Sequence, residues 1–245
     1  RRNSACSWSS ENGEPGPPRV RTSTPASAVR MRFTSFSKST GASDMRCSLS
    51  GAGAETAISA VSFVGSSDIA HYVYNRGVAA GKRVQAMGGA KNHGIVMPDA
   101  DLDQVVNDLT GAAFGSAGER CMALPVVVPV GEDTAERLKE KLIPAIHALK
   151  LGISTDPEAH YGPVVTAQHK AKVEGWIQKC ADEGAELVID GRDYKLQGHE
   201  EGYFIGPTLF DHVTTDMESY KEEIFGPVLQ MVRAKDFEEA VSLPS

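Results

Sequence analysis

The sequence predicts an α/β fold with a mainly parallel sheet, and three observations lead to this prediction. From residue 57 onwards, short apolar runs typical of strands alternate with longer runs of helical period. Glycine or proline separates many of these elements, where the chain has to turn. The chain has 245 residues and is 41% hydrophobic, which is enough apolar material for a substantial core.

The first strand and helix are expected close to residue 57. The β-branched run Ile58–Val64 predicts a strand, and Gly65 opens a tight turn in which Ser66 or Ser67 is the helix N-cap. The apolar positions of the expected helix are Ile69, Tyr72, Val73 and Gly77. A helix N-terminus behind a glycine turn suits a phosphate or pyrophosphate, although an ordinary strand–helix connection explains the same residues equally well.

The remaining elements follow the same alternation. Strands are expected at residues 83–86, 93–97, 124–129, 186–190 and 228–232, with an extended segment at 204–210. Helices are expected from a cap at Asp99 or Asp101 to Gly115, and at residues 134–149, 167–183 and from 237. Cys180 lies on the apolar stripe of the third of these helices and is predicted to be a core residue.

A candidate nucleophile lies between the helix that ends at Gly115 and the next strand. The chain turns through Gly118 and places Cys121 immediately before that strand, open to the loop side. The thiolate is the nucleophilic form of cysteine, and Arg120 with the N–H groups of the turn favours an anion here. On these residues alone, the commoner role of a lone cysteine is a small buried hydrophobe.

A second short motif, Glu222 to Val228, combines a carboxylate, an aromatic ring and a Gly-Pro turn before a strand. Glu223 is able to accept hydrogen bonds from a ribose diol, and Phe225 to pack on a flat ring. The alternative is an ordinary solvated acidic face, formed with Glu218, that precedes a buried phenylalanine.

Composition excludes several classes of function. The net charge of −7 argues against a nucleic-acid partner. The sequence has no run of 18 apolar residues, so no membrane span is predicted. The four cysteines are widely spaced without a C-x-x-C pair, which fits a reducing compartment. No histidine pattern of a zinc enzyme is present, so no metal site is expected.

Residues 1–56 differ in composition from the rest of the chain. They carry a net charge of +4 against −11 for the remainder, and they contain twelve serines and the cluster Pro15-Gly-Pro-Pro18. Such a segment buries too little apolar surface to offset the entropy of ordering it, so it is predicted to be disordered.

Taken together, four motifs resemble the aldehyde dehydrogenase superfamily in order and approximate spacing, over about residues 57–245. They are Phe63-Val-Gly-Ser-Ser67, Gly89-Ala-Lys-Asn92, Gly118-Glu-Arg-Cys121 and Glu223-Ile-Phe-Gly-Pro227. Within the superfamily, the sequence from Gly115 to Ala123 is most similar to that of the CoA-acylating branch, which oxidises malonate and methylmalonate semialdehyde.

The resemblance implies a role for each matched residue. Cys121 is the catalytic nucleophile, which forms a thiohemiacetal with the aldehyde and becomes a thioester after hydride transfer to NAD. Arg120 holds the carboxylate of the substrate, for which an arginine fork is suited. The matched cofactor-binding positions are Gly65 and Ser66 at the pyrophosphate, and Glu223 and Phe225 at the nicotinamide ribose.

One departure from the superfamily concerns the acyl acceptor. Hydrolytic members have a glutamate that activates water at the position that Met87 occupies here, aligned on Lys91 and Asn92. A thioether takes no proton from water, so hydrolysis lacks its base. The resemblance therefore implies coenzyme A as co-substrate, with CO2 loss to propionyl-CoA or acetyl-CoA. Alternatively, Met87 only fills a gap in a core.

The resemblance also implies how the chain is organised. Residues 1–56 match no part of the family and are expected to be read from another frame of the same gene; residues 57–86 correspond to a remnant of the NAD-binding domain, and residues 87–245 to a C-terminally truncated catalytic domain. Full-length members are homo-oligomers, expected here as a tetramer, in the cytoplasm of a bacterium or the mitochondrial matrix of a eukaryote. The alternatives are a non-catalytic fragment and another aldehyde dehydrogenase of CoA-dependent or hydrolytic type.

Overall fold

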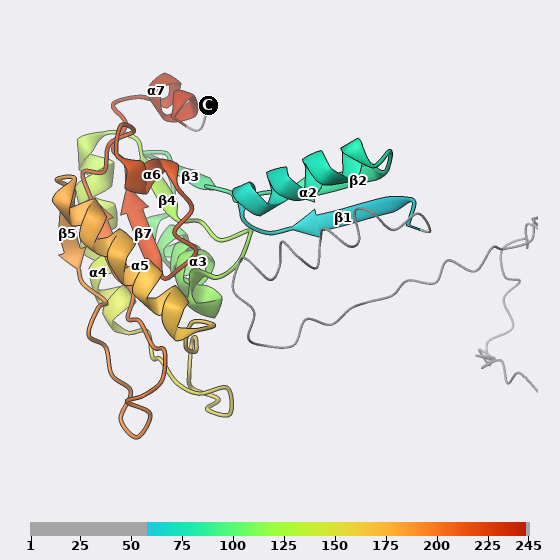
Figure 1. The fold of residues 1–245 in the computed structure, drawn as a ribbon. Helices are drawn as coiled ribbons and strands as arrows, with labels where there is room; N and C mark the ends of the chain where they lie inside the picture. Colours follow the sequence, from blue (N-terminus) through green and yellow to red (C-terminus); the bar gives the residue numbers. More distant parts are fainter. Residues whose placement is uncertain (1–57, 244–245) are drawn as a thin grey trace, which may run out of the picture. The chain divides into compact units, whose positions relative to one another are not determined.

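The structure, a computed structural model, describes residues 58–243 and is drawn in Figure 1. The predicted disorder of residues 1–56 lies outside the described residues. Within them, the strands form a two-stranded sheet and a five-stranded sheet, which confirms the α/β prediction.

The two-stranded sheet is a single strand–helix–strand unit. β1 (Ala60–Val64) pairs in parallel with β2 (Arg83–Met87), and α2 (Ser67–Ala79) connects them. A Cβ at Gly77 would lie 2.4 Å from a methyl carbon of Val84, so the absence of a side chain at Gly77 lets the helix pack closely on β2.

The five-stranded sheet has the order β3-β4-β7-β6-β5. Its strands are β3 (His93–Val96), β4 (Val126–Pro129), β5 (Glu186–Ile189), β6 (Thr208–Asp211) and β7 (Val228–Met231). All neighbours are parallel except β5 and β6, which are antiparallel. Every residue of β4, β6 and β7 is buried, as expected for the inner strands of a sheet that is covered on both faces.

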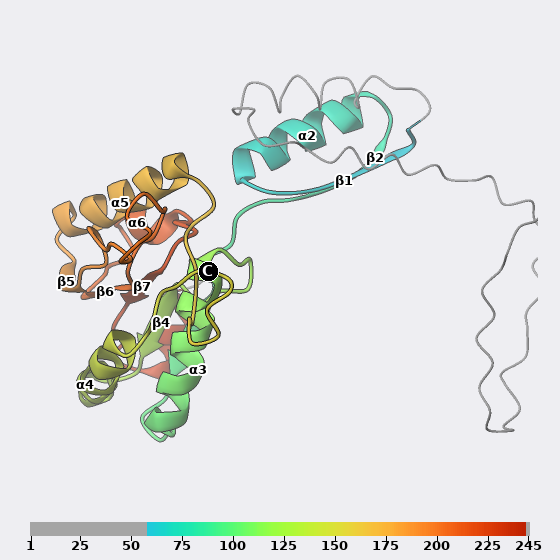
Figure 2. The same ribbon diagram turned by 90° about the horizontal axis from the view of Figure 1, so that it is seen from below.

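Helices cover both faces of this sheet, with α5 on one and α3 and α4 on the other (Figure 2). Their bounds are α3 (Leu102–Phe114), α4 (Glu132–His147), α5 (Ala167–Asp182), α6 (Glu218–Lys221) and α7 (Phe237–Ser242). In α5, Val173, Ile177 and Cys180 are completely buried, so the prediction of Cys180 as a core residue is confirmed. In the part of the chain that the structure describes, none of the helices combines the length and apolar character needed to cross a bilayer.

Most element predictions agree with the structure within a few residues, and the cap of α3 is Asp101, whose side chain accepts from the Asp103 and Gln104 N–H groups. Two short elements were missed: a 3₁₀ turn at Gly115–Gly118 and the four-residue helix α6. Part of the alternative for the Glu222–Val228 motif agrees with the structure, because Glu218 and Glu222 are exposed. The phenylalanine that follows them, Phe225, is exposed and not buried.

Candidate active site

The loop that carries Cys121 begins where α3 ends, and its backbone conformation is unusual. Ser116, Ala117 and Gly118 have φ of 54°, 56° and 69°, in the left-handed region that residues other than glycine rarely adopt. A Cβ at Gly118 would lie 2.1 Å from the carbonyl oxygen of Gly226, so the loop lies directly against the segment that follows Phe225. Contacts of this kind are what stabilise a strained turn.

Arg120 is bound to the end of helix α3. Its Nε donates to the Gly115 carbonyl at 3.1 Å and its Nη2 to the Gly111 carbonyl at 2.9 Å. The Gly111 carbonyl also accepts from the Gly115 N–H, so Arg120 adds a second bond at the last turn of α3. A Cβ at Gly115 would lie 1.7 Å from Nη2, so a side chain at this position would displace the guanidinium.

Asn92 contacts the same loop from the other side. Its Nδ2 donates to the Cys121 carbonyl at 2.9 Å and to the Ala123 carbonyl at 2.8 Å. Cys121 itself is exposed, and Cys180, the other cysteine in the described residues, is buried. Cys121 is therefore an exposed thiol on a loop whose backbone accepts two hydrogen bonds from the side chain of Asn92.

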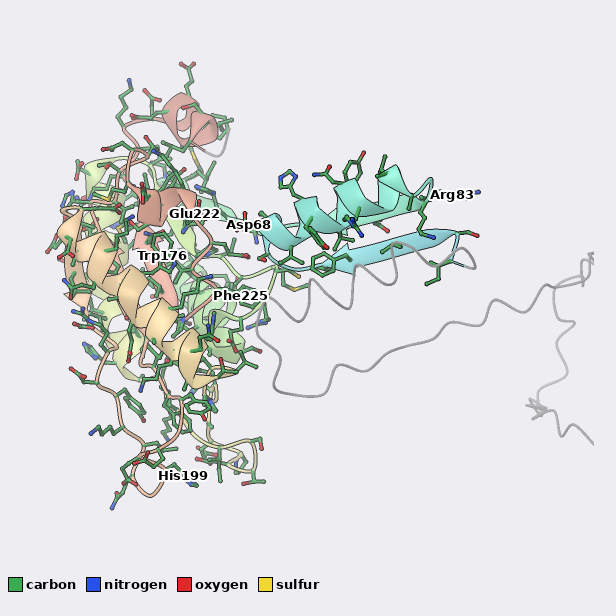
Figure 3. The ribbon with its side chains drawn as sticks, in the orientation of Figure 1. Asp68, Arg83, Trp176, His199, Glu222 and Phe225 are labelled. Atoms are coloured by element: carbon green, nitrogen blue, oxygen red, sulfur yellow. The ribbon has the colours of Figure 1, made fainter. Side chains whose placement is uncertain are left out.

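Glu223 lies on the segment between α6 and β7, where Figure 3 labels its neighbours Glu222 and Phe225. Its Oε1 accepts from the Ala90 N–H at 3.2 Å. Lys91 Nζ donates to the Glu222 carbonyl at 2.7 Å and to the Ser219 carbonyl at 2.9 Å. Burial lowers the pKa of Lys91 to about 8, although Cys180 and the two glutamates oppose this shift.

Phe225 is held in a left-handed conformation, with φ of 56°. Its carbonyl oxygen lies 2.7 Å from Nε2 of His169, a residue in the first turn of α5. The same Nε2 lies 3.2 Å from a carboxylate oxygen of Glu119, which also accepts from the Val165 N–H. Both neighbours of Nε2 are acceptors, so this nitrogen carries the hydrogen and links the Phe225 segment to the Cys121 loop.

Four of the six predicted site residues line one hollow, namely Cys121, Arg120, Glu223 and Phe225. Asn92 and Gly118 line it as well. Its volume is about 20 Å³, which holds a single water molecule and no substrate. A larger cavity of about 270 Å³ lies near Arg192 and Tyr194, and none of the predicted site residues lines it.

The other two predicted residues, Gly65 and Ser66, lie at the start of α2. Ser66 is the N-cap, as predicted, but its side chain makes no capping bond, so the first N–H groups of α2 keep their capacity to bind an anion. The hydroxyl of Ser67 accepts from the Gly89 N–H at 3.1 Å, and the Gly65 N–H donates to the Met87 carbonyl at 3.1 Å. These residues therefore contact the segment that also contacts Glu223 and Cys121.

One group of potential metal ligands exists among the described residues: Glu186, Asp211 and His212. The Asp211 carboxylate accepts from Arg233 and Lys139, which already compensate its charge. The group therefore does not suggest a role for a metal.

A comparison with known protein families matches residues 52–244 to the aldehyde dehydrogenase family, which is most of the chain. The chain belongs to the aldehyde dehydrogenase family. This result agrees with the resemblance carried by the four motifs, but the match begins at residue 52, so the expectation that residues 1–56 match no part of the family is wrong for residues 52–56.

Two curated members of the family are similar to this chain over most of its length. The chain is 56% identical to malonate-semialdehyde dehydrogenase of Pseudomonas aeruginosa over 186 residues, which are 76% of this chain and 37% of that protein. It is 50% identical to the acylating, mitochondrial methylmalonate-semialdehyde dehydrogenase of Arabidopsis thaliana over 186 residues, which are 76% of this chain and 30% of that protein. The chain therefore spans less than two fifths of the length of these curated relatives.

A solved structure from Sinorhizobium meliloti 1021, described as a methylmalonate-semialdehyde dehydrogenase complexed with NAD, has the same fold over the shared region. Its sequence is 56% identical, its TM-score is 0.79, and the match covers 80% of this chain and 40% of that one. The expected family, the fold and the incomplete coverage are thus all confirmed.

Three residues of the candidate site are not indicated by the sequence. Asn92 and Lys91 belonged to a recognised motif, but nothing in the motif indicated which carbonyls they would reach. His169 gave no signal, because a polar residue in the first turn of an amphipathic helix is ordinary. Its contact is formed only when α5 packs beside the Phe225 segment.

Proposed function

We propose that this chain carries the nucleophile and part of the cofactor site of an NAD-dependent, CoA-acylating dehydrogenase for malonate or methylmalonate semialdehyde. The observation that carries the proposal is the single hollow lined by Cys121, Arg120, Glu223 and Phe225. The names of the relatives in Pseudomonas aeruginosa and Arabidopsis thaliana supply the substrate class.

In the proposed reaction, the Cys121 thiolate attacks the aldehyde carbon and forms a carbon–sulfur bond, while the carbonyl electron pair moves to oxygen. NAD, when bound, supplies the acceptor for the hydride that leaves this carbon. The product is a thioester on Cys121. Arg120 provides a positive charge beside the thiol, which suits a substrate with a second, anionic group.

The thioester then needs an acyl acceptor. Met87 lies at the end of β2 with half of its surface exposed, so it does not fill a core, and it offers no base for water. Coenzyme A carries a thiol that becomes a thiolate nucleophile itself. Its attack on the thioester carbon forms the CoA thioester and releases the Cys121 thiolate. CO2 leaves from the substrate carboxylate, and a proton from water takes its place on the carbon that held it. We propose acetyl-CoA or propionyl-CoA as the product.

The residues present fit part of an NAD site. The start of α2 at Ser66 offers uncapped N–H groups to a pyrophosphate. Glu223 Oε1 accepts from the Ala90 N–H, and Oε2 has no partner among residues 58–243, so it can accept from a ribose hydroxyl. We assign residues 57–86 to the end of the NAD-binding domain and residues 87–245 to the catalytic domain. A tetramer is proposed for the complete enzyme.

The test uses the purified chain with methylmalonate semialdehyde and NAD, with and without coenzyme A, and follows NADH formation. Cys121→Ala is expected to abolish turnover, and Cys180→Ala, a change at the buried cysteine, to preserve it. CoA-dependent turnover that survives in Cys121→Ala would contradict the proposal.

The coverage of less than two fifths of the relatives favours one alternative, a fragment without catalysis. A folded chain that neither binds NAD nor turns over would support this alternative. Turnover without coenzyme A would instead indicate a hydrolytic aldehyde dehydrogenase.

A further inference from the structure

The short segment from Gly89 to Asn92, here called the 89–92 turn, makes contact with each of the other three sequence motifs. Its Gly89 N–H donates to Ser67 Oγ, its Ala90 N–H to the Glu223 carboxylate, and Lys91 Nζ to the carbonyls of residues 219 and 222. Asn92 Nδ2 donates to the carbonyls of residues 121 and 123. All of these bonds are donated by the 89–92 turn.

We propose that the 89–92 turn is a positioning device with two separable halves: Asn92 fixes the backbone of the nucleophile Cys121, and Lys91 fixes the backbone of the segment that presents Glu223. This inference rests on the proposed function, because it takes Cys121 and Glu223 as the reacting and cofactor-contacting groups. Neither Asn92 nor Lys91 is proposed to touch the reacting atoms.

Asn92 is suited to its half because a carboxamide nitrogen has two hydrogens, and here each is used on a carbonyl of the same loop. Few other backbone bonds hold this loop: Ala123 N–H donates to the Arg120 carbonyl and Leu124 N–H to the Ala112 carbonyl. Residues 121–123 belong to neither helix nor strand. The carboxamide therefore supplies a large share of the bonds that fix the orientation of the Cys121 peptide.

Lys91 is suited to the other half because its long side chain reaches two carbonyls, at Ser219 and at Glu222, on either side of the end of α6. The Glu222 carbonyl belongs to the peptide bond that leads into Glu223. A buried ammonium group is costly unless it is hydrogen-bonded, so these carbonyls are its compensation. Gln230 Nε2 also donates to the Ser219 carbonyl, so the Glu222 bond is the one that Lys91 alone provides among the described residues.

The two halves are joined by a single peptide bond but reach different segments. Asn92 contacts the loop before β4, and Lys91 contacts the loop before β7. If each side chain positions only its own segment, removing one should loosen one segment and leave the other as it was. A turn that acted only as general structural support would loosen both.

The experiment measures hydrogen–deuterium exchange in the full 245-residue chain for Asn92→Asp and Lys91→Met. Asn92→Asp keeps the shape but places acceptors against two carbonyls. Amide exchange at residues 121–124 is expected to rise at least ten-fold and at residues 218–226 to change less than two-fold. Lys91→Met, which keeps the length without the charge, is expected to give the reverse. The matched controls are Asn75→Asp and Lys150→Met, both exposed, which should change neither segment.

Kinetic constants provide a second readout. If the 89–92 turn were only a structural support, the two variants would not affect different kinetic constants. Asn92→Asp is expected to lower kcat at least ten-fold with the KM for NAD within two-fold, and Lys91→Met to raise that KM at least five-fold. Equal exchange changes in both segments, or none in either, would overturn the inference. If each variant changes exchange only in its own segment but the chain has no turnover, the positioning roles of Asn92 and Lys91 are supported and the proposed function is rejected. The two failures are therefore distinguishable.

Discussion

Replacement of Asp211 by asparagine tests the ionic contacts that join strands β6 and β7 to helix α4. The side chain of Asp211 is completely buried, and its oxygens accept from Arg233 at 2.5 and 3.1 Å and from Lys139 at 2.9 Å. Asp211→Asn keeps the volume and removes the charge that both cations share. Breaking a buried ion pair by removing one partner costs about 3–5 kcal/mol. Arg233 keeps partial compensation from Glu132 and Glu136, so we expect a loss near 3 kcal/mol.

The same contacts predict a dependence on pH. Burial would raise the pKa of Asp211, but hydrogen bonds from Arg233 and Lys139 outweigh it and lower the pKa to about 2. A lowered pKa means that this stabilisation is present above about pH 4, where the unfolded carboxyl is ionised, and is lost as the pH falls to about 2. The full shift is worth about 2 kcal/mol.

Urea unfolding at pH 7 and at steps down to pH 2, followed by circular dichroism, measures both effects. The control is Asp133→Asn, because Asp133 forms an exposed ion pair with Arg137 and its loss should cost no more than about 1 kcal/mol. The difference in stability between the unchanged chain and Asp211→Asn should shrink as the pH falls. A cost at Asp211 no larger than at Asp133, or one that is constant with pH, would refute the reasoning.

Two further predictions concern the candidate active site. Gly118→Ala places a Cβ 2.1 Å from the Gly226 carbonyl at a φ of +69° and should cost about 2 kcal/mol or more, whereas Gly175→Ala, with open space in α5, should gain about 0.5–1 kcal/mol; thermal unfolding compares them. Met87→Glu supplies a base for water and should raise CoA-independent NADH formation about ten-fold or more, which Met87→Gln should not do. Equal melting shifts for the two glycines, or equal rates for the two Met87 variants, would contradict these predictions.

Much of the fold could be predicted from local sequence because its elements obey their own periodicities. The buried positions of α5 recur at helical spacing, and β4 is a continuous apolar run. The antiparallel pairing of β5 with β6 was not predicted in detail. These strands are joined by residues 190–207 without a helix, and a parallel pair needs a long crossover, which in this fold is a helix.

The conformation of the loop that carries Cys121 could not be predicted in the same way. Ser116 and Ala117 have no intrinsic preference for positive φ, so their left-handed conformation has to come from contacts with distant segments. The same holds for α6, whose four residues are too few to show a period. Cys121 could be singled out as a candidate because it follows a glycine turn, but the residues that hold it come from α5 and from the 89–92 turn.

The bonds of Arg120 to α3 are compatible with its proposed role toward a substrate carboxylate. A guanidinium group presents several N–H groups in a planar fork, and the bonds to Gly115 and Gly111 use Nε and one hydrogen of Nη2. Both hydrogens of Nη1 and the second hydrogen of Nη2 have no hydrogen-bond partner among the described residues, and they include the end-on pair that binds a carboxylate bidentately. The helix end can therefore fix the plane of the guanidinium before substrate arrives, so less side-chain entropy is lost when the carboxylate binds. A lysine at position 120 could not both bond the end of α3 and bind a carboxylate bidentately, because its ammonium group lacks the planar arrangement of N–H groups on two edges.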